Sequence, residues 1–91
     1  MVKVIKSDGT KEAFDVNKVR RAVETAAEEA RVPQARAREV AERAVRAARA
    51  ATKDRNEVKS STIRTSVLRE LDSSERSIAT AWRKYDSARK K

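Results

Sequence analysis

Residues 2–21 have the sequence VKVIKSDGTKEAFDVNKVRR, and this stretch decides the fold. Asp8-Gly9 is typical of a two-residue type I′ hairpin turn, because both central residues of that turn need a positive φ. Valine and isoleucine precede the turn and Phe14 follows it, so two short strands joined at Asp8-Gly9 are predicted over about residues 2–14. Gly9 is the only glycine of the chain, and it stands where backbone freedom is needed.

A helix is predicted to begin directly after Asp15, whose short acceptor side chain suits an N-cap. Apolar residues then recur at helical spacing, which predicts a helix over about residues 16–31. Lys18 falls in its first turn, where free amides and the helix dipole already carry positive character and disfavour a cation. A bound phosphate chain would reverse that preference, and Lys6 from the first strand would add a second charge. The alternative is that Lys18 is an ordinary solvated lysine.

A second helix is predicted over about residues 33–51, because Pro33 suits its first position and alanine and valine recur at helical spacing after it. Glutamate precedes arginine by four positions on its polar face, in the pairs Glu39 with Arg43 and Glu42 with Arg46. Pairs at this spacing support a solvated helix. This helix is therefore interpreted as structural, although its other arginines leave an excess of positive charge.

The rest of the chain is predicted to add two helices, which cover about residues 61–71 and 73–89. Ser60 or Ser61 suits the cap of the first of these helices. Asp72 with Glu75 has the form of a capping box at the start of the second.

Composition excludes most enzyme classes. The 91 residues fit one small domain, and they contain no cysteine and no histidine, so zinc centres and Ser-His-Asp catalysis are effectively excluded. A single glycine cannot build a phosphate-binding P-loop or a dinucleotide fingerprint. We therefore expect no catalytic activity. The chain has no apolar run long enough for a membrane span and no signal peptide, so a cytoplasmic location without membrane contact is expected.

The pattern V-x-K-x-D-G-x-x-E-x-F-D-x-x-K-V, which runs from Val4 to Val19, resembles the opening of the ATP-cone family. These are regulatory domains of many ribonucleotide reductases and of the repressor of their genes. Residues 58–64 resemble the family's strand and third helix, which implies a third short strand over residues 57–59. Residues 78–85 with Arg89 resemble the family's closing helix. The chain departs from the family pattern at Ser7, where a basic residue is frequent, and at Asp86, where the family usually has arginine.

The resemblance implies an α+β fold, mostly α, in which a small N-terminal hairpin or three-stranded sheet caps a four-helix bundle. It also implies a site that binds ATP or dATP, with or without Mg²⁺, and does not hydrolyse it. By position in the motif, Lys6 and Lys18 would take phosphates, and Glu12 and Asp15 would lie near the sugar and base. The candidates on the bundle side are Ser60, Arg64 and Arg89.

If the resemblance holds, the chain is a stand-alone regulatory domain whose nucleotide state switches self-association or the binding of a protein or DNA partner. A nucleic-acid-binding module is the alternative, because the net charge is +9 and the second and fourth helices are rich in arginine. The glutamates interleaved along the second helix argue against it, as does the lack of exposed aromatics beside a basic patch. A small helical scaffold without a ligand, natural or designed, is the third possibility.

Overall fold

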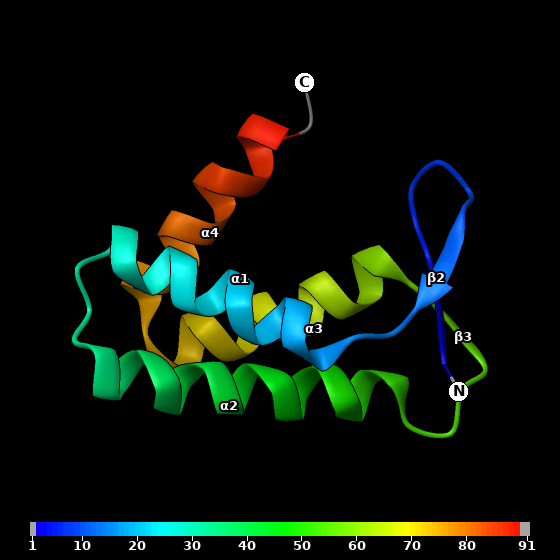
Figure 1. Cartoon of the computed structure of the whole chain (residues 1–91), viewed down its shortest axis with the longest axis horizontal. Helices are drawn as coiled ribbons and strands as arrows, with labels where there is room; N and C mark the ends of the chain where they lie inside the picture. The colour runs from blue at the N-terminus through cyan, green and yellow to red at the C-terminus, as the bar shows by residue number, and fades with distance from the viewer. Residues whose placement is uncertain (1, 90–91) are drawn as a thin grey trace.

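The computed structural model describes the backbone of residues 2–89 and the side chains of residues 2–84. Its elements, in chain order, are β1 (Lys3–Ile5), β2 (Lys11–Ala13), α1 (Val16–Glu29), α2 (Gln34–Thr52), β3 (Glu57–Lys59), α3 (Ser60–Ser74) and α4 (Arg76–Arg89). The helices form the body of the molecule and the sheet lies at one end of it (Figure 1). The predicted α+β fold, mostly α, with a small sheet and four helices, is confirmed.

The sheet has the strand order β2-β1-β3, with β1 antiparallel to β2 and parallel to β3. Val4 in the central strand pairs with Glu12 on one side and with Val58 on the other. Side chains alternate between the two faces of a strand, so these three residues share one face. Val58 is buried against the helices, which makes this the inner face. The outer face carries the exposed Lys3, Lys11, Glu57 and Lys59.

The four helices are held together by a core made mostly of alanine and valine. α1 contacts α2 and α4, and α3 likewise contacts α2 and α4. The largest fully buried side chains are Leu71, Ile78, Val23, Val40 and Val67. Alanines fill the remaining core positions, and their small size lets neighbouring helices approach closely enough to exclude voids. None of the helices in the described chain is both long and apolar enough to cross a membrane.

The start of α1 follows the sequence prediction, since Asp15 is its N-cap. The Asp15 carboxylate accepts a hydrogen bond from the backbone N–H of Asn17, with an N···O distance of 2.9 Å. The helix ends with Arg31 at φ 59°, a left-handed conformation that glycine usually supplies. The Arg31 and Val32 amides donate back to carbonyls of the last turn of α1, which closes the helix without a glycine.

The predicted type I′ turn at Asp8-Gly9 is wrong. Lys6 donates its amide to the Thr10 carbonyl at 2.8 Å, and Gly9 donates to the Lys6 carbonyl at 2.9 Å, so the loop has three residues, 7–9. Within that loop only Gly9 has a positive φ, of 88°. The cause is the Asp8 side chain, which accepts hydrogen bonds from the amide and the hydroxyl of Thr10. These bonds lower the pKa of Asp8 and hold the aspartate outside the left-handed region.

Both predicted side-chain caps of the later helices are also wrong. α3 begins at Ser60 with Lys59 at its N-cap position and no side-chain hydrogen bond, so neither Ser60 nor Ser61 caps it. Asp72 lies inside α3 and binds the guanidinium of Arg83 through both carboxylate oxygens, at 3.0 and 2.7 Å. A bidentate partner on α4 is a stronger attraction for this carboxylate than a free amide.

Candidate functional site

Three of the predicted site residues meet on the inner face of the sheet. The Glu12 carboxylate lies 3.4 Å from the Nζ of Lys18 and 3.8 Å from the Nζ of Lys6, through the same oxygen. All three side chains are accessible, with exposed fractions of 66% for Lys18, 48% for Lys6 and 40% for Glu12. Two ammonium groups thus share one carboxylate in a place that a ligand can reach.

The backbone explains why these residues converge. Lys6 follows β1 and alternates with Val4, so its side chain lies on the same face as Glu12 of β2. Lys18 reaches this face from the first turn of α1, where its amide donates to the Asp15 carbonyl at 3.2 Å. Asp15 itself stands between β2 and α1, and its carboxylate is occupied by the Asn17 amide. The site is therefore built by one strand pair and the helix that directly follows it.

Ser60 and Arg64 lie in α3, which begins directly after β3, on the side of β1 opposite β2. β1 and β3 are parallel and Ile5 pairs with Lys59, so Lys6 and Ser60 both follow their strands at the same end of the sheet. Ser60 is half-buried at the start of α3, and Arg64 is half-buried one helical turn later. The structure thus places Ser60 at the end of the sheet where Lys6 lies. Arg89 lies in α4, and its side chain is outside the described residues.

The cluster has the electrostatics of an anion site. Two lysines against one glutamate leave one net positive charge, and the N-terminus of α1 beside them adds the positive end of the helix dipole. Its ion pairs are exposed, and such pairs contribute only about 0–1 kcal/mol each. A polyanion can therefore replace Glu12 as the partner of both lysines at little cost.

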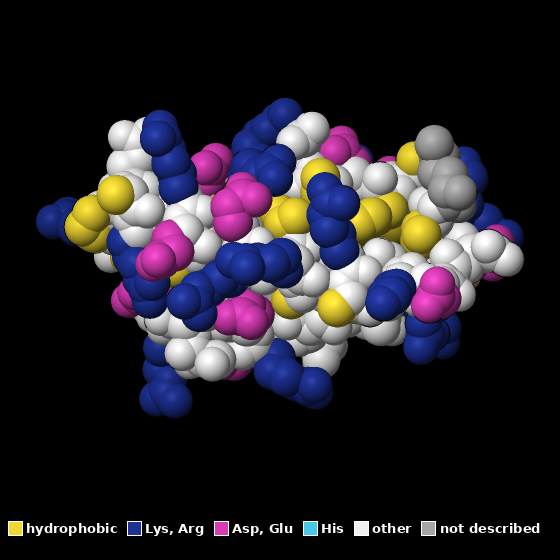
Figure 2. Space-filling model, turned by 90° about the horizontal axis from the view of Figure 1, so that it is seen from below, with side chains coloured by type: hydrophobic (Ala, Val, Ile, Leu, Met, Phe, Trp, Pro, Cys, Tyr) yellow, Lys and Arg dark blue, Asp and Glu magenta, His cyan; other side chains and the backbone are white. Residues whose placement is uncertain are grey.

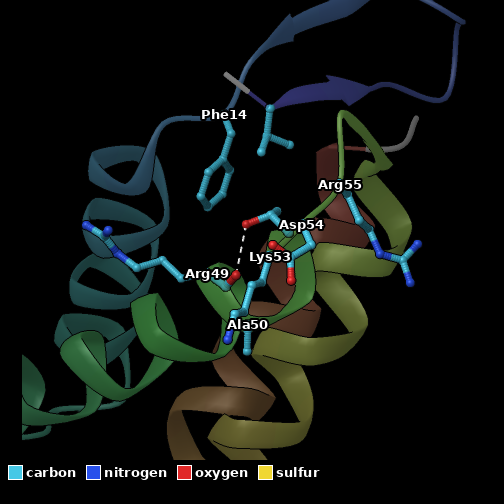
Figure 3. Close-up of a pocket in the computed structure, with 8 residues that line it drawn as sticks. Phe14, Arg49, Ala50, Lys53, Asp54 and Arg55 are labelled. Carbon is cyan, nitrogen blue, oxygen red and sulfur yellow. Dashed lines mark hydrogen bonds between the residues drawn. The ribbon is translucent and has the colours of Figure 1, made fainter.

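Sequence reasoning missed a cavity of about 470 Å³ at the opposite end of the sheet. Its lining consists of Val2, Phe14, Arg49, Ala50, Thr52, Lys53, Asp54 and Arg55. Phe14 points into it, whereas the side chains of Arg49 and Arg55 extend to opposite sides (Figure 3). Because these cations diverge, they do not enclose one anion. The only sequence signal was that Val2 and Phe14 extend the inner-face alternation beyond the strands.

The chain was compared with known proteins at the level of families and of individual sequences. The model of the ATP cone domain matches residues 2–91. No curated protein matches the chain significantly. The family match includes the lysines of the inner face, α1 and the strand that leads into α3, and it covers nearly the whole sequence. The chain belongs to the ATP-cone domain family.

Proposed function

We propose that this chain binds ATP or dATP at Lys6, Glu12 and Lys18 without hydrolysing it, and that the nucleotide controls self-association or the binding of a partner. Membership of the ATP-cone family implies a nucleotide-binding regulatory module. The observation that supports this location is the convergence of Lys6 from β1 and Lys18 from α1 on the single carboxylate of Glu12.

In this mechanism the triphosphate takes over the lysines that Glu12 holds in the free protein. A triphosphate carries several negative charges and accepts several hydrogen bonds, so it outcompetes one exposed carboxylate for two ammonium groups. Glu12 is then available to the sugar or the base, together with Asp15 at the start of α1. The half-buried Ser60 and Arg64 contribute from α3, and Arg89 from α4.

In this proposal the protein has no metal site of its own, and a metal ion binds only together with the nucleotide. Within residues 2–84 no group of three acidic side chains lies close enough to hold a metal ion. We therefore propose that Mg²⁺, where it is present, arrives on the phosphates and contacts the protein through them. The role of the protein residues is to bind and orient the triphosphate.

The site can act as a switch because it joins two parts of the fold, the sheet and the helical body. Lys6 belongs to the sheet and Lys18 to the helical body, and the two are connected by exposed ion pairs through Glu12. A triphosphate that contacts both lysines favours one placement of the sheet against α1. A partner that prefers the same placement then binds more tightly when nucleotide is present, as linkage requires.

Calorimetric titration with ATP, dATP and GTP tests this proposal. The variant Lys6→Ala with Lys18→Ala is expected to weaken adenine-nucleotide binding by about tenfold or more, since each lysine supplies a charge-assisted hydrogen bond. The matched control is Lys3→Ala with Lys11→Ala, which removes the same charge from the outer face of β1 and β2. Equal reductions in both double variants would refute the assigned site.

The switching part needs its own measurement. Sedimentation velocity of the free chain and of the chain saturated with ATP or dATP is expected to show a nucleotide-dependent change in mass. The Lys6→Ala, Lys18→Ala variant should lose that change while its free-state mass is unaltered. An identical distribution with and without bound nucleotide would exclude self-association as the output and leave a partner as the regulated species.

A further inference from the structure

The outer side of α2 carries cations that form no ion pair among the described side chains of residues 2–84. They are Arg38, Arg43, Arg46 and Arg49 of α2 with Lys53 directly after it, and all five are exposed. Within those described residues, none of the five takes part in a hydrogen bond or ion pair through its charged group. We call these five residues the basic face.

The glutamates expected to neutralise this face are occupied elsewhere, so the predicted pairs of Glu39 with Arg43 and Glu42 with Arg46 do not form. Arg20 of α1 binds both oxygens of Glu42, at 2.6 and 3.2 Å. Glu39 is bound by Arg36 instead. The reason is geometric: α1 is packed against α2 and brings Arg20 to Glu42 in a bidentate arrangement, which is stronger than a solvated pair along one helix.

The unpaired cations form a row rather than a scatter. Arg43, Arg46, Arg49 and Lys53 follow one another at intervals of three or four residues, which places them on one side of the helix over about 15 Å. Figure 2 looks onto this side and shows Lys and Arg side chains projecting along the length of the molecule. A hollow of about 470 Å³ lined by Arg43, Arg46, Ala47 and Glu70 lies in it.

We propose that the basic face binds the phosphate backbone of double-stranded nucleic acid. Four of its five cations are arginine, whose planar fork matches phosphate oxygens in pairs. Ala47 and the exposed Ala50 separate them, and such small side chains let the helix approach a groove edge closely. This surface is distinct from the Lys6–Glu12–Lys18 site, so the proposal does not depend on nucleotide binding.

Two other polyanions fit the same residues less well. A single strand is usually held by aromatic side chains that stack on its bases, and α2 has no aromatic residue. A membrane surface is usually bound by large apolar side chains beside the cations, and the exposed apolar residues of α2 are alanines. Contacts to backbone phosphates need neither feature, and they predict binding that ignores base sequence and weakens with salt.

Fluorescence anisotropy with a labelled 20-base-pair duplex, over a series of salt concentrations, tests the proposal. The variant Arg43→Gln, Arg46→Gln, Arg49→Gln should weaken binding and reduce the salt slope by about three, one for each arginine that no longer neutralises a phosphate. The matched control is Lys3→Gln, Arg21→Gln, Lys84→Gln, which removes the same charge from β1, α1 and α4. Circular dichroism verifies that both variants fold. Glu70→Gln, which removes the one carboxylate of the hollow, should tighten binding.

The outcomes distinguish the basic face from its alternatives. A larger reduction in the α2 variant than in the control, with binding retained by Lys6→Ala, Lys18→Ala, supports a duplex site on the basic face. If duplex affinity falls equally in the two triple variants, binding depends only on net charge and the proposal is overturned. Competition by polyglutamate as effective per charge as unlabelled duplex would instead assign the face to an acidic protein. Tighter binding to anionic phospholipid vesicles would assign it to a membrane surface.

Discussion

Arginines between the helices and arginines on the basic face of α2 have opposite environments, although their sequence surroundings are alike. Arg20 joins α1 to Glu42 of α2, and Arg83 joins α4 to Asp72 of α3. Arg36 joins the start of α2 to Glu75 and to the Ser74 carbonyl at 2.7 Å. Arg43 and Arg46 have glutamates four residues before them and still form no ion pair with any side chain of residues 2–84.

The difference shows that charge spacing along one helix does not determine pairing once other helices are packed against it. Glu42 pairs with Arg20 of α1, which offers it two hydrogen bonds, and Glu39 pairs with Arg36 of its own helix, which also binds Glu75. The basic face is positive because the glutamates of α2, Glu42 and Glu39, pair with Arg20 and Arg36. Each of these two arginines also links α2 to another part of the fold. Stability of the bundle and charge of its surface are therefore set by the same interactions.

Charge reversal at Arg36 is expected to have the largest effect on stability. Arg36→Glu would place a third carboxylate beside Glu39 and Glu75 and would leave the Ser74 carbonyl without its donor. Thermal unfolding should show a clear drop in the midpoint, and adding Glu75→Arg should restore part of it. Arg43→Glu is the matched control. If it destabilises the protein as much as Arg36→Glu, the distinction between the two groups of arginines fails.

Acid should weaken the ion pairs between helices specifically. Arg83 holds the pKa of Asp72 below its ordinary value, and Arg20 holds the pKa of Glu42 below its ordinary value, through hydrogen bonds to the charged carboxylates. The unfolded chain then binds more protons than the folded chain at acid pH, so this stability is complete above the ordinary carboxyl pKa values. It is lost as the pH falls from those values through the lowered folded-state pKa of each carboxyl group.

Urea unfolding at a series of pH values measures this decline. The variant Arg20→Gln with Arg83→Gln should be less stable near neutral pH and should show a shallower decline toward acid. Arg38→Gln with Arg43→Gln, which carries the same charge change at exposed positions of α2, should keep the wild-type slope. Parallel slopes in all three proteins would show that the two carboxylates do not carry the pH dependence.

Glu12 offers a third environment, in which one carboxylate is shared by two lysines beside the proposed ligand. Glu12→Gln frees Lys6 and Lys18 from their competitor, so inorganic tripolyphosphate should bind several-fold more tightly. ATP should bind more weakly, because the proposed interaction of the Glu12 carboxylate with the sugar or base can no longer form. Calorimetry tests whether the affinity for tripolyphosphate rises while the affinity for ATP falls. If both affinities rise, Glu12 is only a competitor of the phosphates.

The smallest change is expected from neutralising the basic face. Arg43→Gln, at an exposed position without an ion pair, should alter the free energy of unfolding by no more than about 0.5 kcal/mol. The same substitution should still reduce the salt slope of duplex binding by about one. Chemical denaturation and anisotropy separate the two properties. A destabilisation comparable to that of a core substitution would mean that Arg43 has a structural role.

Local patterns predicted the elements well because the elements depend on nearby residues. The Asp15 cap and the helical spacing of alanine and valine both appear in the structure, and so does the strand at residues 57–59 that the family resemblance implied. Two errors share one cause, which is that an aspartate had more than one possible partner. Asp8 accepts hydrogen bonds from Thr10 and avoids a positive φ, and Asp72 binds Arg83 of the next helix.

The convergence of Lys6 and Lys18 was predictable because their spacing is local. Lys6, Glu12 and Lys18 lie within one hairpin and one helical turn, so strand alternation and helix geometry bring them together. The basic face was not predictable, because its charge depends on Arg20 reaching Glu42 from another helix. The cavity beside Phe14 was missed for a similar reason, since its wall comes from the end of α2 and the loop that follows.

The parallel pairing of β1 with β3 has a consequence for how the protein folds. Lys11 and Glu57 stand 46 positions apart, and Glu57 follows two complete helices, yet their side chains meet at 2.6 Å. Closing so long a loop is entropically costly, so the sheet is expected to assemble after α1 and α2 have docked. Without β3 the remaining two-stranded hairpin is marginal in water. Lys6 therefore acquires its fixed place last during folding, and a ligand that holds it should slow the first step of unfolding.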